Sequence, residues 1–132
     1  MMRSLRTRTV AALGLVAVLA AGAAGCAPDY DRTEITAVRP SLLGGRVDRS
    51  RIEVPAGLIV TAHFVSYNDD NKVMGMTLRA TNPEIVEVSP VISEYDYAFI
   101  GLKPGVTDVE VLADNKVVLI ISAVVGPQPA QP

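Results

Sequence analysis

Apolar side chains recur at every second position over several stretches of this chain, and this period limits its fold more than any other feature. In residues 58–65 the apolar positions are Leu58, Val60, Ala62 and Phe64. The same alternation is present in residues 73–80 and 106–113. Because successive side chains of a β-strand point to opposite faces, this period indicates strands with one buried face.

Turn-forming residues separate these stretches. Gly, Pro, Asn and Asp gather in residues 55–57, 67–72, 81–84, 103–105 and 113–116. The sequence Lys-Pro-Gly predicts a type II turn with a positive φ at Gly105, and the last two strands should form a hairpin around Asp114 and Asn115. Short strands joined by tight turns predict an all-β fold, with half-buried antiparallel strands in a sandwich or a barrel.

Residues 1–25 read as an export signal. Three arginines at positions 3, 6 and 8 precede a stretch without charge, residues 10–24. This stretch of 15 residues is short for a membrane span, which needs roughly 20 apolar residues. A basic start followed by a short apolar region is typical of a signal peptide.

The signal ends in Ala23-Ala24-Gly25-Cys26, which resembles the lipobox of bacterial lipoproteins. The resemblance implies a lipoprotein with diacylglycerol on the thiol of Cys26 and a further acyl chain such as palmitate on its amine. A disulfide within the chain is excluded because Cys26 is the only cysteine. A zinc site would need three or four ligands, and the chain has one Cys and one His. A free thiol after ordinary signal cleavage and an uncleaved anchor remain alternatives.

The mature chain divides into three parts. Residues 26–34 are predicted to be a polar tether, residues 35–125 the β-sandwich domain, and residues 126–132 a disordered, proline-rich tail. The lipid anchor predicts a location in the cell envelope, on the periplasmic or surface face of a membrane. Ala27 after the cysteine is compatible with the outer membrane if the organism has one.

Two further segments resemble the bacterial Ig-like domain of group 2. They are "TNPEIVEVS", residues 81–89, with an Asn-Pro turn before a Val-x-Val strand, and "GLKPGVTDVEV", residues 101–111. The residues around 35–40 and 52–64 fit the first two strands of that family. The resemblance covers residues 35–125 and implies an all-β fold of the Ig-like type, an antiparallel β-sandwich.

The charge and the motifs argue against catalysis and against nucleic-acid binding. From Cys26 onward the chain has nine Lys and Arg residues against 14 Asp and Glu residues, which disfavours contact with phosphate backbones. The single histidine, His63, should point outward from its strand, and no Gly-x-Ser-x-Gly motif supplies a nucleophile. We therefore predict that the protein is not an enzyme and has no cofactor.

Acidic residues in two loops form a candidate calcium site. Its ligands would be Asp69, Asp70, Glu94 and Asp96. Carboxylate oxygens are the ligands that Ca²⁺ prefers, and the two loops would have to lie at one end of the sandwich. The alternative is that Asn and Asp serve only as turn formers here.

The last predicted strand, residues 117–125, is apolar on both faces. A strand of a two-layer sandwich normally has one face in water. Either residues 39–45 fold over the outer face, or that face, which includes Val118 and Ile120, docks a partner. The aromatic residues Tyr95, Tyr97 and Phe99 should share one side of another strand, as core packing or as an exposed patch.

These features favour a membrane-anchored envelope lipoprotein with a non-catalytic Ig-like module. Its partners would be membrane lipid, through acylated Cys26, and an envelope protein or glycan. Adhesion, glycan contact and service as an accessory subunit of an envelope assembly are the roles such a module could have. A Ca²⁺-binding envelope module is the alternative.

Overall fold

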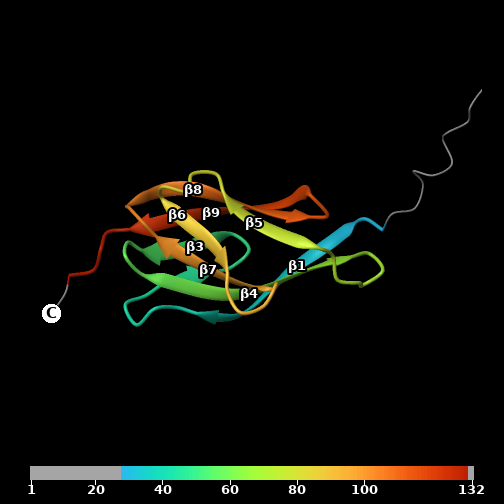
Figure 1. Ribbon diagram of the computed structural model, residues 1–132, viewed down its shortest axis with the longest axis horizontal. Helices are drawn as coiled ribbons and strands as arrows, with labels where there is room; N and C mark the ends of the chain where they lie inside the picture. The colour runs from blue at the N-terminus through green and yellow to red at the C-terminus, as the bar shows by residue number, and fades with distance from the viewer. Residues whose placement is uncertain (1–27, 131–132) are drawn as a thin grey trace, which may run out of the picture.

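A computed structural model describes residues 28–130 of the chain. The predicted signal peptide and Cys26 lie outside these residues. The described part consists of two β-sheets packed face to face, so the predicted all-β sandwich is confirmed (Figure 1). Within residues 28–130, no helix is long and apolar enough to cross a membrane.

Nine strands build the two sheets. They are β1 (Tyr30–Arg39), β2 (Arg46–Val47), β3 (Arg51–Pro55), β4 (Ile59–Asn68), β5 (Met76–Ala80), β6 (Val86–Pro90), β7 (Asp96–Gly101), β8 (Gly105–Ala113) and β9 (Lys116–Gly126). The four-stranded sheet has the order β1-β4-β7-β6, and the five-stranded sheet has the order β2-β3-β9-β8-β5. All pairs are antiparallel except β3 with β9, which run parallel.

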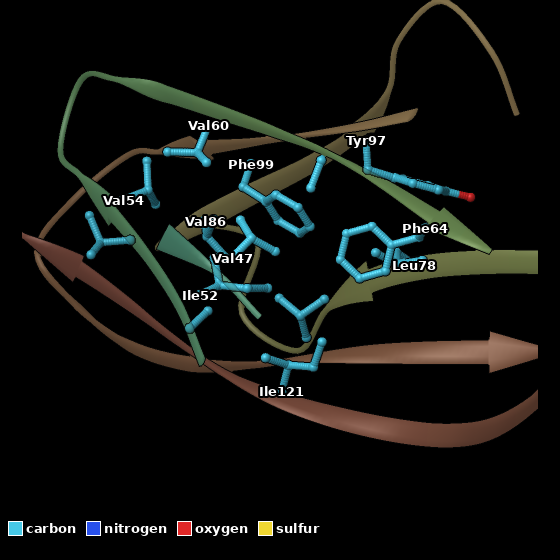
Figure 2. Close-up of a cluster of buried hydrophobic side chains, with 14 of the residues drawn as sticks. Val47, Ile52, Val54, Val60, Phe64, Leu78, Val86, Tyr97, Phe99 and Ile121 are labelled. Carbon is cyan, nitrogen blue, oxygen red and sulfur yellow. The ribbon is translucent and has the colours of Figure 1, made fainter. Parts of the chain in front are cut away.

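The predicted alternation matches the buried faces. In β4 the side chains of Val60, Ala62 and Phe64 are buried, while those between them are partly exposed. Phe64 lies at the centre of the core, with its ring centroid 5.7 Å from that of Phe99 and 6.0 Å from that of Tyr97 (Figure 2). Core packing is therefore observed for Tyr97 and Phe99. Tyr95 does not share their side, because it precedes β7 and its ring centroid lies 5.8 Å from that of His63.

The predicted hairpin has the expected backbone geometry, and the predicted turn at Gly105 does not. Asp114 and Asn115 both have positive φ, 48° and 66°, as a two-residue hairpin of type I′ requires. Gly57 has φ 81° in the turn between β3 and β4. The prediction of a positive φ at Gly105 is wrong, because Gly105 is the first residue of β8 and pairs with Val125 in extended geometry.

The domain begins earlier than predicted. Strand β1 starts at Tyr30, so residues 30–34 of the expected tether belong to the sandwich. These residues are polar, so their sequence does not show the apolar alternation of a buried strand. The side chain of Thr33 is nevertheless buried, and it forms a 2.8 Å hydrogen bond with the buried hydroxyl of Ser66 on β4. A buried hydroxyl that has a partner costs little, so a polar edge strand can still pack against the core.

The two chain ends leave the sandwich at opposite ends of its long axis (Figure 1). One end of the sandwich is called the N-terminal end here; it holds the start of β1, the loop of residues 69–75 and the turn at Asp114. The other, which holds the turns of residues 55–58, 81–85 and 102–104 and the exit of β9, is the far end. Backbone hydrogen bonds tie the far end together, from Gly57 N to Gly101 O at 2.8 Å and from Ala56 N to Gly126 O at 3.0 Å.

Candidate functional site

The outer face of the four-stranded sheet carries a titratable pair in contact across two strands. His63 on β4 and Asp96 on β7 are direct cross-strand partners, and His63 Nδ1 lies 2.8 Å from Asp96 Oδ1. Both side chains are only partly buried, as the predicted outward orientation of His63 requires. The pKa of Asp96 lies below its usual value, mainly because His63 and then the hydroxyl of Ser93 hydrogen-bond to the carboxylate. The positive charge of Arg39 acts in the same direction.

This pair does not form a hydrolytic triad. A triad needs a nucleophile hydrogen-bonded to the imidazole, with the carboxylate on its other side. Here the hydroxyl of Ser93 donates to Asp96 Oδ2 at 2.8 Å, and within residues 28–130 no hydroxyl is hydrogen-bonded to the ring of His63. The carboxylate therefore joins the loop before β7 to strand β4, which is a positioning role.

A hollow of about 260 Å³ lies beside this pair, between β1, β4 and the loop that joins β6 to β7. Its lining residues are Ala37, Arg39, Thr61, Ala62, Val91, Ile92 and Asp96. Arg39 pairs with Thr61 across β1 and β4. The hollow thus combines one guanidinium with a mainly aliphatic rim, and sequence reasoning did not single out Arg39.

The candidate calcium ligands are not brought together. Within the described part of the chain, no three His, Cys, Asp or Glu side chains lie close enough to hold a metal ion. Both oxygens of Asp96 are occupied by His63 and Ser93. In the loop that holds Asp69 and Asp70, Asn68 Oδ1 accepts a hydrogen bond from the backbone N–H of Lys72 at 2.9 Å. The polar residues of this loop therefore act as turn formers, while Glu94 lies in the separate loop between β6 and β7.

The two residues of the candidate partner face lie in different surroundings. The register of β8 and β9 shifts by one residue, because Val111 pairs with Leu119 and Leu112 with Val117. Val118 is the extra residue of this bulge, and its partly buried side chain packs against the core. Ile120 is 56% exposed, opposite Glu110 on the outer face. Strict alternation through residue 118 would have placed both side chains on the same face.

The segment of residues 39–45 reaches only one part of that outer face. Leu43 and Val124 line a hollow of about 390 Å³ together with residues of β3 and of the chain after β9. Ile120 is not among the lining residues of this hollow. Leu42 at the tip of the segment is fully exposed. The segment therefore lies beside the far end of β9.

Solved structures of S-layer proteins share this fold. A structure of domains 4 and 5 of the S-layer protein SbsC aligns over 76% of this chain with a TM-score of 0.56 and 15% sequence identity. The structure of SbsC domains 1–6 aligns over 79% of this chain with a TM-score of 0.56 and 14% identity. The chain spans 54% and 14% of the lengths of these two structures. No protein-family model and no curated protein matches the sequence.

Proposed function

We propose that this protein is a lipid-anchored, non-catalytic module of the bacterial cell envelope, which acts by binding or as part of an assembly. The observation that carries the proposal is the position of β1. An ordered sandwich begins at Tyr30, four residues after a cysteine that follows an export-type segment. The fold shared with domains of an envelope protein, SbsC, supports the same setting. Membership of group 2 of the bacterial Ig-like domains stays a prediction.

A lipid on Cys26 would hold the domain close to the bilayer. Four residues of extended chain reach at most about 14 Å, at roughly 3.3–3.6 Å per residue. Two or three acyl chains anchor firmly, whereas a single chain binds only marginally. The N-terminal end of the sandwich would therefore face the lipid, and the far end would point away from it.

The two ends differ in the side chains that they expose. Around the N-terminal end, acids outnumber bases. The acids are Asp29, Asp31, Asp69, Asp70 and Asp114, and the bases are Arg32, Lys72 and Lys116. Such an end is not attracted to anionic lipid. Around the far end lie five exposed apolar side chains, Leu42, Leu43, Ile59, Leu102 and Val106, whereas the N-terminal end has two, Val73 and Val117. Exposed apolar side chains mark surfaces that bind other proteins, so a partner would meet the far end.

The absence of catalysis belongs to the same proposal. The pair of His63 and Asp96 has two members of a hydrolytic triad, but the hydroxyl of Ser93 bonds the carboxylate and not the imidazole. The neighbouring hollow of about 260 Å³ is smaller than the roughly 300–1,000 Å³ of typical small-molecule sites. These features support binding or architecture as the role of the domain.

Fractionation of a bacterial host tests the proposal. The full chain, its Cys26→Ser variant and an Ala27→Ser control are expressed, and membranes are washed with high salt and alkaline carbonate. We expect the unchanged chain and the control to remain with the membrane and the Cys26→Ser variant to be lost from it. Equal release of all three proteins would contradict lipid anchoring.

A further inference from the structure

A β-bulge in β1 determines which side chain faces the hollow of about 260 Å³. Thr36 pairs with His63, and the next partners in register are Arg39 and Thr61, so β1 has one extra residue between them. Without that residue Val38 would lie opposite Thr61. With it, Arg39 takes the outward position, and Val38 packs against the core. Bulges commonly redirect a side chain in this way.

The bulge is held in an unfavourable backbone conformation. Ala37 has φ 49°, a left-handed conformation that costs about 1 kcal/mol or more for a residue with a Cβ atom. Such outliers persist where the surrounding structure requires them, and they are enriched at binding sites. Here the strained residue itself lines the hollow into which Arg39 is turned.

The guanidinium of Arg39 has no acid committed to it. Among residues 28–130, four arginines form salt bridges with neighbouring acids, whereas Arg39 forms none. Asp96 also borders the hollow, but its two oxygens accept hydrogen bonds from His63 and Ser93. The planar donor fork of Arg39 is therefore available, and such a fork matches the two oxygens of a carboxylate.

Apart from Arg39, Thr61 and Asp96, the residues that line the hollow are aliphatic. Val91 is 50% and Ile92 is 94% exposed in the loop between β6 and β7, and both line the hollow together with Ala37 and with Ala62, whose methyl group is buried in the core. A volume of about 260 Å³ admits a group of the size of one amino-acid residue, not a complete cofactor.

We propose that this hollow binds the carboxyl-terminal residue of a peptide, with the carboxylate on Arg39 and an aliphatic side chain against Val91 and Ile92. The guanidinium accounts for the carboxylate and the aliphatic rim for the aliphatic side chain, and the end of a peptide chain is the source of both groups to which the proposal commits. The site goes beyond the proposed anchoring, because it depends on the folded domain and not on Cys26. The ligand is small and the hollow is open, so we expect a dissociation constant on the order of millimolar.

Residue-resolved NMR titration of the isotopically labelled chain, isolated from its host in detergent, tests the site. The probes are N-acetyl-valine, its uncharged analogue N-acetyl-valinamide, and isovalerate, which has the carboxylate and the aliphatic group but lacks the peptide. We expect N-acetyl-valine to shift the resonances of residues 37–39, 61 and 91–96. N-acetyl-valinamide should bind at least about tenfold more weakly, since a charge-assisted hydrogen bond is lost. Isovalerate that binds as well as N-acetyl-valine would show that any small aliphatic acid suffices and would overturn the peptide assignment.

Two arginine variants separate the site from a general charge effect. Arg49 is the matched control, because it also forms no salt bridge among the described residues and does not line the hollow. We expect Arg39→Gln to weaken binding of N-acetyl-valine about tenfold or more and Arg49→Gln to change it less than about twofold. Equal binding of acid and amide, equal effects of the two variants, or shifts centred elsewhere would each overturn the proposal. If N-acetyl-valine does not bind but the chain with Cys26 remains with the membrane on fractionation, the peptide site is wrong and the anchoring proposal still holds.

Discussion

Gly101 on β7 packs so closely against Pro55 on β3 that a Cβ atom at Gly101 would lie 2.5 Å from the Pro55 carbonyl oxygen. The two residues belong to different sheets. The contact therefore fixes how closely the sheets approach at the far end, where Gly57 N also donates to Gly101 O. A side chain at position 101 would push backbone against backbone.

Replacing Gly101 with Ala is expected to destabilise the domain by about 1–3 kcal/mol, the usual cost of overpacking a close contact. Gly126→Ala is the matched control, because no atom lies within 4 Å of a Cβ built there. Urea denaturation followed by circular dichroism measures both. The account of the sheet contact fails if the two variants unfold at the same urea concentration.

Truncation of the two adjacent isoleucines of β9 should change the stability of the domain by very different amounts. Ile121 is 0% exposed in the core, whereas Ile120 is 56% exposed. We expect Ile121→Ala to cost about 2–5 kcal/mol and Ile120→Ala to change stability by less than about 0.5 kcal/mol. Thermal and urea unfolding of both variants test this. A large loss for Ile120→Ala would mean that the outer face of β9 is covered.

The carboxylate of Asp48 should make the free energy of unfolding of the domain depend on pH. Its Oδ1 accepts hydrogen bonds from the hydroxyl of Ser50 at 2.6 Å and from the backbone N–H groups of Ser50 and Arg51 at 2.8 and 2.9 Å. The hydroxyl and the backbone of Ser50 hold the pKa of Asp48 well below its usual range. A lowered pKa in the folded state adds stability above the unfolded value, near 3.9, and this stability is lost as the pH falls below it.

The expected result is that Asp48→Asn is less stable than the unchanged protein at pH 7. The difference should shrink as the pH falls from about 4 toward 2. Asp70→Asn is the control for the loss of one surface carboxylate, because Asp70 lies at an exposed loop position and forms no salt bridge within residues 28–130. The urea concentrations at the unfolding midpoint of the three proteins, measured at several pH values, test this expectation. A difference that stays constant down to pH 2 would contradict the role of Asp48.

The short link between Cys26 and β1 predicts a fixed orientation on the membrane. Single cysteines introduced by Asn115→Cys at the N-terminal end and Leu42→Cys at the far end can be labelled with a fluorophore, since an acylated Cys26 does not react. In vesicles with nitroxide-labelled headgroups we expect quenching at position 115 to exceed quenching at position 42. Equal quenching would show that the domain tumbles freely or lies on its side.

Side-chain alternation made most of the fold predictable. The buried positions of β4, β5 and β8 follow directly from it, as Phe64, Leu78 and Val109 illustrate. The hairpin at Asp114 and Asn115 was predictable because a type I′ turn needs residues that tolerate positive φ. These features are local, and a local pattern is sufficient to specify them.

Long-range pairing and register shifts were not predictable in the same way. The parallel pairing of β3 and β9 joins residues about 70 positions apart and leaves no local pattern. The extra residues at Ala37 and Val118 reverse the alternation, so Arg39 is turned outward and Val118 inward. The contact of His63 with Asp96 required knowledge that β4 pairs with β7. The candidate site depends on two of these relationships, the extra residue at Ala37 and the pairing of β4 with β7.

The mass of the intact mature protein, purified from bacterial membranes, tests the central claim most directly. The account predicts a chain that begins at Cys26 and carries the added mass of diacylglycerol, with or without a further acyl chain on its amine. A mature chain with an unmodified thiol at residue 26, or one that begins at another residue, would contradict it.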